Sequence, residues 1–266
     1  MTVTVAFDRA RADGRAALVG YLPAGFPTVA GGIAAVRALA EAGADLIEVG
    51  FPYSDPVLDG PVIQRASEIA LADGVRPTDV LATVAAVAAA GVPAVIMTYW
   101  NLVERYGVRT FARDLAAAGG SGLITPDLIP DEASEWLAAA EEHDLDRIFL
   151  VAPSSTDARL AMTVAACRGF VYATSVMGVT GAREATSRAA PALVARVRAV
   201  AGPLPVGVGL GVRDGAQAAE VAGYADGVIV GSALVGCLLD ASDLASGLVS
   251  LRRLTTELAA GVRAKV

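Results

Sequence analysis

The chain has 266 residues, of which 55% are hydrophobic and 18% are charged, and its formal net charge is −7. Such a composition belongs to a folded protein with a large core. The acidic balance, without a dense Lys/Arg cluster, argues against nucleic acid or an anionic membrane as a partner. Apolar stretches end before the roughly 18 residues that a membrane span needs, and the N-terminus lacks a signal-peptide pattern. We therefore expect a cytoplasmic protein.

Two residue types that often carry chemistry are scarce. The chain contains one histidine, His143, and one lysine, Lys265, which lies next to the C-terminal residue. A Schiff-base enzyme needs a lysine inside its site, and a transition-metal site usually needs several His or Cys ligands. A Ser-His-Asp triad is disfavoured because His143 lies at an acidic, solvated helix end. Cys167 and Cys237, in apolar helical contexts, are expected to be reduced.

Short β-branched runs alternate with longer Ala-rich stretches along the chain. The runs predict strands at Ala17–Leu22, Asp45–Gly50, Ala94–Tyr99, Gly122–Thr125, Arg147–Val151, Phe170–Ala173, Val206–Val208 and Gly227–Val230. Helical patterns lie near 29–42, 62–73, 77–90, 108–118, 131–143, 156–167, 186–200, 214–222 and 243–263. Acidic residues at the starts of two of these patterns, after Pro130 and at Asp157, favour the positive end of a helix dipole.

Eight such strands with intervening helices predict a parallel sheet closed into a (β/α)₈ barrel, the TIM-barrel architecture. A doubly wound open sheet is the alternative. No composition break marks a linker, so we expect a single domain over residues 1–266. Residues 102–110 are expected to form a longer connection that borders the site.

One carboxylate falls at the end of an apolar strand. In the run from Asp45 to Gly50, alternate side chains face opposite sides, so Ile47 and Val49 should pack outward against helices. Glu48 then points into the barrel at its carboxyl end, where barrel enzymes form their active sites. Burial there should raise the pKa of Glu48, which suits a general acid near neutrality. A buried structural glutamate paired with an arginine or with backbone amides is the alternative.

The loop after this strand carries two further carboxylates. Prolines at positions 52, 56 and 61 stiffen it, and Asp55 and Asp59 both lie within it. Either aspartate could be a solvated turn residue, and the pattern of the residues alone does not decide between them.

Glycine-rich turns follow the last three predicted strands. They contain Gly178 to Gly181, Gly207 to Gly211, and Gly231 with Ser232. Glycine lets backbone N–H groups approach an anion, and barrels often bind phosphate in the loops after strands 7 and 8. The turns together predict a phosphate site. They do not form a dinucleotide fingerprint, because Asp214 stands where its third glycine is required.

Aromatic residues, only 5% of the chain, gather near the strand ends. They are Tyr21, Tyr99, Trp100, Phe170 and Tyr172. This grouping is typical of a site that binds a flat apolar ligand. For Trp100 and Phe170, packing in the core is the alternative.

With these motifs in place, the chain strongly resembles the family of tryptophan synthase α subunits. The matching blocks are Tyr21–Pro27, Glu48–Gln64, Tyr99–Asn101, Gly122–Asp127, Tyr172 through Gly178–Gly181, Gly209–Gly211 and Gly231–Ala233. They span nearly the whole chain in the family's order, and the Glu48–Gln64 block is highly specific.

The resemblance implies a (β/α)₈ barrel that cleaves indole-3-glycerol phosphate to indole and glyceraldehyde 3-phosphate, without a cofactor or metal. Glu48 is implied to be the acid–base residue, and Asp59 to accept a hydrogen bond from the indole N–H; the resemblance thus separates Asp59 from Asp55. Thr180 and Gly181 are implied to belong to a lid. Phosphate is expected at Gly181, Gly211, Gly231 and Ser232, and the indole ring at Tyr21, Tyr99, Tyr172 and Leu210.

A partner is implied as well. The family's α subunit docks on a β subunit that carries pyridoxal phosphate, and an α₂β₂ tetramer is expected. Pro52, Asp55 and Pro56 are then expected to face that subunit. No pyridoxal phosphate is expected on this chain, which has no suitable lysine.

Some positions depart from the family's pattern. Leu58 replaces the usual small residue before the loop aspartate, Val176 and Met177 follow Ser175 where the lid commonly has Arg, and Leu210 replaces a pocket aromatic. Two alternative functions stay open. One is a stand-alone lyase that releases free indole, and the other is a weakly active regulatory subunit that activates a β partner.

Overall fold

The computed structural model describes residues 2–174 and 189–264. Its eight described strands pair in chain order, all parallel, and β8 pairs with β1 to close a barrel. The strands are β1 (Ala17–Pro23), β2 (Leu46–Gly50), β3 (Ala94–Met97), β4 (Gly122–Thr125), β5 (Asp146–Val151), β6 (Val171–Thr174), β7 (Val206–Gly209) and β8 (Gly227–Val230). The predicted (β/α)₈ barrel is confirmed, and the open-sheet alternative is excluded.

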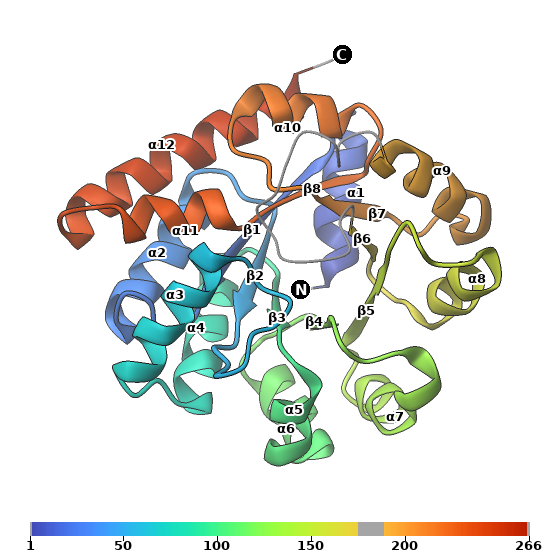
Figure 1. Ribbon diagram of the computed structural model, residues 1–266, viewed down its shortest axis with the longest axis horizontal. Coiled ribbons are helices and arrows are strands. Elements are labelled where there is room, and N and C mark those ends of the chain that lie inside the picture. The colour runs from blue at the N-terminus through green and yellow to red at the C-terminus, as the bar shows by residue number, and fades with distance from the viewer. Residues whose placement is uncertain (1, 175–188, 265–266) are drawn as a thin grey trace.

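Helices surround the strands as an outer ring (Figure 1). They are α1 (Val3–Ala12), α2 (Val29–Glu41), α3 (Pro61–Ala72), α4 (Pro77–Ala89), α5 (Trp100–Tyr106), α6 (Val108–Ala117), α7 (Ser134–Glu142), α8 (Asp157–Ala166), α9 (Ala189–Ala201), α10 (Gly215–Ala222), α11 (Ser232–Leu239) and α12 (Leu244–Arg263), with a short 3₁₀ turn, η1 (Pro130–Glu132). Side chains of Thr28, Thr156, Asp214 and Asp243 cap the N-termini of α2, α8, α10 and α12.

Three helices were not predicted from the sequence. These are α1, α5 and α11, each of ten residues or fewer. The longer connection expected at 102–110 contains most of α5, and α6 begins at Val108. Gly107 separates the two helices with a φ of 93°, a conformation that glycine adopts at little cost.

The alternation along β2 follows the prediction. Ile47 and Val49 are fully buried in the layer between strands and helices. Leu46 packs in a second cluster inside the barrel, and Glu48 lies above it, 1% exposed. The strand therefore alternates its side chains between the outer core and the barrel interior, which aims Glu48 at the carboxyl end of the barrel.

The opposite, N-terminal end of the barrel is closed by α1, which lies across the ring in Figure 1. Phe7 of α1 packs on Phe170 with their ring centroids 5.3 Å apart, and Phe170 lies 6.3 Å from Tyr172. The Val3 N–H donates to the buried Asp146 carboxylate, which also accepts from Arg168. The interior is thus filled by aromatic rings from α1 up to Tyr172.

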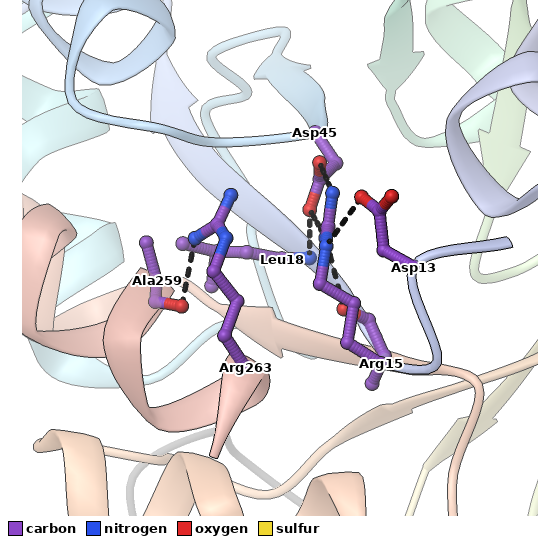
Figure 2. Close-up of polar contacts among 7 residues, drawn as sticks. Asp13, Arg15, Leu18, Asp45, Ala259 and Arg263 are labelled. Carbon is purple, nitrogen blue, oxygen red and sulfur yellow. Dashed lines mark hydrogen bonds and ion pairs between the residues drawn. The ribbon is translucent and has the colours of Figure 1, made fainter. Parts of the chain in front are cut away.

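An ion pair fastens β1 to β2 at the same N-terminal end (Figure 2). The Arg15 guanidinium binds both carboxylate oxygens of Asp45, at 2.7 and 2.9 Å, and their side chains are 10% and 13% exposed. Asp45 also accepts from the Leu18 N–H, and Asp13 accepts from Arg15. These hydrogen bonds, led by that to Asp45, raise the pKa of Arg15.

Cys167 and Cys237 are both half-buried and form no disulfide bond in the structure; their reduced state stays a prediction. In residues 2–174 and 189–264, no group of three or more His, Cys, Asp or Glu side chains is placed to hold a metal ion. Within the same ranges, no helix has the length and apolar character of a membrane span.

Candidate active site

A cavity of about 530 Å³ opens at the carboxyl ends of the strands. That volume is in the range of small-molecule sites. Residues from separate parts of the barrel meet there: Tyr21, Glu48, Leu58, Asp59, Ile63, Met97, Pro126, Leu150, Val151, Ala152, Ser155, Tyr172, Thr174, Gly209, Leu210, Gly211, Ile229, Gly231 and Ser232. Among the described residues, no Arg, Lys or His lines it. Any anion that binds there must therefore be held by neutral donors or by residues outside the described ranges.

Glu48 lies in the wall of this cavity, between Tyr21 of β1 and Val95 of β3 in the strand register. Its Oε1 atom is buried and has no hydrogen-bond partner among the described residues. Burial disfavours the charged form and raises the pKa of Glu48 to about 8. At neutral pH the carboxyl therefore keeps its proton and can donate it to a ligand in the cavity. The alternative was a structural glutamate paired with an arginine or with backbone amides. Within the described residues, Glu48 forms no ion pair and its Oε1 accepts no hydrogen bond.

Asp59 reaches the cavity from the loop between β2 and α3. The loop is folded on itself, because the Asp59 N–H donates to the Pro56 carbonyl at 3.0 Å. The Gln64 side-chain amide of α3 donates to the carbonyls of Asp59 and Pro56, at 2.9 and 3.3 Å. Burial raises the pKa of Asp59 to about 6, so this carboxylate is largely ionised at pH 7.

Asp55 has a different environment from Asp59. It is exposed, does not line the cavity, and accepts a hydrogen bond from the neighbouring Ser54 hydroxyl at 2.7 Å. The structure thus places Asp59, and not Asp55, beside Glu48. Of the other loop residues, Pro52 is buried and Pro56 half-buried, while Val57 and Leu58 are 73% and 40% exposed.

Two tyrosines line the cavity near the carboxyls. A Cβ atom at Gly50 would collide with the Tyr21 hydroxyl, and one at Gly209 would lie 2.6 Å from the Tyr172 hydroxyl. Glycine at the ends of β2 and β7 therefore makes room for both rings. Burial, together with the negative charges of Glu48 and Asp59, raises the pKa of each phenol well above its ordinary value. Both remain neutral and provide flat walls with a polar edge.

Leu210, Gly211, Gly231 and Ser232 line the cavity in the loops after β7 and β8. Gly211 has a φ of 72°, in the region that favours glycine. Helix α11 begins at Ser232, and no described side chain caps its N-terminus. Its first N–H groups and the positive end of its dipole are therefore available to an anion.

Among the described residues, Tyr99 is a predicted site residue that does not line the cavity. Tyr99 is 7% exposed and lies behind Asp59, with its hydroxyl 3.5 Å from the carboxylate. Thr180 and Gly181 lie outside the described residues, as do Val176 and Met177. Trp100 is partly buried against the core and Phe170 is fully buried, so core packing accounts for both.

Several lining residues were not found from the sequence. Met97, Leu150 and Ile229 lie near the carboxyl ends of β3, β5 and β8, and the alternation that aimed Glu48 inward could have identified them. Ile63 comes from α3 and Ser155 from the turn before α8, and no local pattern marks either one.

A buried protonated carboxyl, an ionised carboxylate, apolar walls and an anion-binding end define a barrel enzyme of the acid–base class. The comparisons with known proteins then specify the family. A sequence profile described as "Tryptophan synthase alpha chain" matches residues 7–263.

Curated relatives carry the same name. The protein from Salinispora arenicola is 72% identical over 261 residues, covering 98% of this chain and 97% of the relative. That from Mycobacterium tuberculosis is 68% identical over 257 residues, covering 97% and 93%.

Solved structures agree with the sequence relatives. An M. tuberculosis tryptophan synthase structure superposes with a TM-score of 0.93 at 65% identity, covering 99% of this chain and 98% of that one. The tryptophan synthase subunit alpha from Legionella pneumophila gives 0.87 at 32% identity, covering 98% of each.

The chain belongs to the tryptophan synthase alpha chain family. It is a carbon–carbon lyase of tryptophan biosynthesis that cleaves indole-3-glycerol phosphate to indole and glyceraldehyde 3-phosphate. This confirms the function that the sequence resemblance implied.

Proposed function

We propose that Glu48 and Asp59 carry out this cleavage by carboxyl acid–base catalysis, with Glu48 moving the protons and Asp59 stabilising charge. The observation that carries the proposal is the buried Glu48 carboxyl in the wall of the cavity, whose Oε1 has no hydrogen-bond partner among the described residues. Its pKa of about 8 lets it hold a proton at neutral pH. The neutral form is the one that a general acid must supply.

The reaction needs one proton delivered and one removed. Glu48 donates its proton to the indole ring carbon that bears the side chain, which places positive charge on the ring. The resulting Glu48 carboxylate then accepts the proton of the adjacent side-chain hydroxyl as the carbon–carbon bond breaks. The bonding electrons return to the ring to give indole, and the hydroxyl carbon becomes the aldehyde. The protons balance, and Glu48 ends in its starting state.

Asp59 faces the charge that develops on the ring. Its carboxylate accepts a hydrogen bond from the indole N–H, which becomes more acidic when the ring carbon is protonated. A fixed negative charge in a water-poor cavity stabilises that state more than the ground state. The pKa of about 6 for Asp59 fits this role, because the group is ionised where Glu48 is still protonated.

The substrate's two ends fit the two ends of the cavity. The indole ring lies against Tyr21, Tyr172 and Leu210, and Tyr99 supports this end from behind Asp59. The phosphate lies at Gly211, Gly231 and Ser232, where the N-terminus of α11 offers backbone donors. Thr180 and Gly181 are added to the substrate-binding residues on the sequence resemblance alone.

The chain acts as one domain over residues 1–266 and works with a β subunit in an α₂β₂ tetramer. The exposed apolar side chains of Val57 and Leu58, beside Asp55 and Pro56, provide a surface for that subunit. Pro52 is buried at the start of this loop. Pyridoxal phosphate belongs to the β subunit, and this chain uses no cofactor of its own. Its place in amino-acid biosynthesis supports a cytoplasmic location.

Measuring indole release by the purified chain, with and without a β subunit, tests the assignment. Strong stimulation by the β subunit is expected. High activity of the chain alone, without further stimulation, would identify a stand-alone lyase. Negligible cleavage in both states, with the β reaction still activated, would identify a regulatory subunit. Either of these outcomes contradicts the proposal.

A further inference from the structure

The Tyr99 hydroxyl touches the catalytic loop at two points. It accepts a hydrogen bond from the Leu58 N–H at 2.9 Å and donates its proton toward Asp59 Oδ2 at 3.5 Å. A phenol has a single proton. Because the Tyr99 oxygen accepts from the Leu58 N–H, its own proton is available for donation to Asp59. The second bond is long, as catalytic hydrogen bonds often are before substrate binds. A small movement of the loop would shorten it.

Tyr99 itself is held in a rigid frame. It precedes α5, and the Trp100 N–H that starts this helix donates to the Asp127 carboxylate at 3.0 Å. Its ring packs on Tyr53 with centroids 4.9 Å apart, and it is 7% exposed. The hydroxyl is therefore a fixed point beside a loop whose outer side chains are exposed.

The backbone and the carboxylate of Asp59 are fixed by different groups. Gln64 holds the Asp59 carbonyl oxygen, which sets the path of the backbone. The carboxylate can still rotate about its side-chain bonds, and within the described residues it accepts a hydrogen bond from the Tyr99 hydroxyl. The orientation of the charge thus depends on this phenol.

We propose that Tyr99 is a positioning residue that orients Asp59 and keeps it ionised, rather than a residue whose main role is to contact the indole ring. The inference rests on the catalytic role proposed above for Asp59. Hydrogen bonding to a carboxylate favours its charged form, and the bond from Tyr99 lowers the pKa of Asp59 against the effect of burial. Burial and the nearby Asp59 raise the pKa of Tyr99 itself, so the phenol keeps the proton it donates.

The pH dependence of indole release by the full-length Tyr99→Phe variant tests this role. Phenylalanine keeps the ring and its packing on Tyr53 and removes the hydroxyl. The acidic limb of the kcat/KM profile should move upward by about one pH unit, and kcat at pH 6 should fall about fivefold with KM little changed. A rise in KM without movement of the limb would show that Tyr99 acts by contacting substrate and would overturn the proposal.

Tyr53→Phe is the matched control. It removes a hydroxyl from the other ring of the same stack, and that hydroxyl accepts from Asn101 instead of touching Asp59. Its acidic limb should stay in place; an equal shift in both variants would assign the effect to the loop as a whole.

Comparing Asp59→Asn with and without Tyr99→Phe distinguishes a failure of this inference from a failure of the proposed function. If Tyr99 acts through Asp59, adding Tyr99→Phe to Asp59→Asn should lower the residual activity less than twofold. A full fivefold loss at pH 6 in that background would contradict the positioning role. Near-wild-type activity of Asp59→Asn alone would instead contradict the proposed catalytic role of Asp59.

Discussion

The two ends of the barrel treat buried carboxyl groups in opposite ways. At the N-terminal end, Asp45 accepts from the two terminal guanidinium nitrogens of Arg15, and Asp146 accepts from Arg168 and the Val3 N–H. At the carboxyl end, Glu48 is buried without a partner for Oε1 among the described residues, and no described basic side chain lines its cavity.

The difference separates a structural use of charge from a chemical one. A buried charge normally needs a partner, because removal from water is costly. The N-terminal end meets that need with ion pairs that join neighbouring segments. At the carboxyl end, Glu48 is buried without such a partner among the described residues. Burial raises the pKa of Glu48 and creates an acid that works near neutral pH. Breaking each arrangement should therefore affect a different property of the protein.

The largest effect is expected for Glu48→Gln. Glutamine keeps the shape of the side chain but can neither donate the required proton nor accept it back, so kcat should fall by about 10³-fold or more. Substrate affinity should change little, since the change removes one oxygen from a large contact surface. Steady-state indole release together with direct binding of a substrate analogue measures both quantities. Near-wild-type turnover would remove Glu48 from the mechanism.

Asp59→Asn should be the next most damaging change, with a loss in kcat of about 10²-fold to 10³-fold. Asp55→Asn is the matched control, because Asp55 is exposed in the same loop and bonds to Ser54. That variant should keep the intrinsic turnover of the isolated chain and alter mainly the stimulation by a β subunit. The same assay compares the two, and a reversal of their phenotypes would show that the two aspartates have been assigned the wrong way round.

Stability should respond with opposite signs at the two ends. Asp45→Asn leaves Arg15 without its carboxylate partner and should lower the free energy of unfolding by about 2–3 kcal/mol with cleavage activity retained. Glu48→Gln should raise the free energy of unfolding at alkaline pH. The pKa of Glu48 is about 8 in the folded protein against 4.5 unfolded, so the wild type loses stability as the pH rises between these values.

Urea denaturation at pH 6 and pH 9 measures both stability effects. The gain from Glu48→Gln over the wild type should grow across this interval, at roughly 1.4 kcal/mol for each pH unit below the folded pKa. A gain that is the same at both pH values would show that Glu48 is not held protonated by the fold.

Much of this arrangement could be predicted from the sequence. The alternation of Leu46 to Gly50 was enough to aim Glu48 into the barrel, because strand geometry is local. The pairing of Asp45 with Arg15 was not predictable, since it joins residues thirty positions apart. Choosing Asp59 over Asp55 from the residues alone was also impossible, because their exposure depends on how Pro56 and Gln64 fold the loop. Helices α1, α5 and α11 were also not predicted, and length alone does not explain this, because α10 has only eight residues and was predicted.

The pH dependence of kcat/KM tests the central claim most directly, because it reports the ionisation of groups in the free enzyme. The rate should rise as Asp59 ionises near pH 6 and fall as Glu48 loses its proton near pH 8. The alkaline limb belongs to Glu48 and reflects the loss of the acid that starts the reaction. A profile that remains flat from pH 7 to about 10 would show that catalysis does not need a protonated Glu48 and would contradict the account.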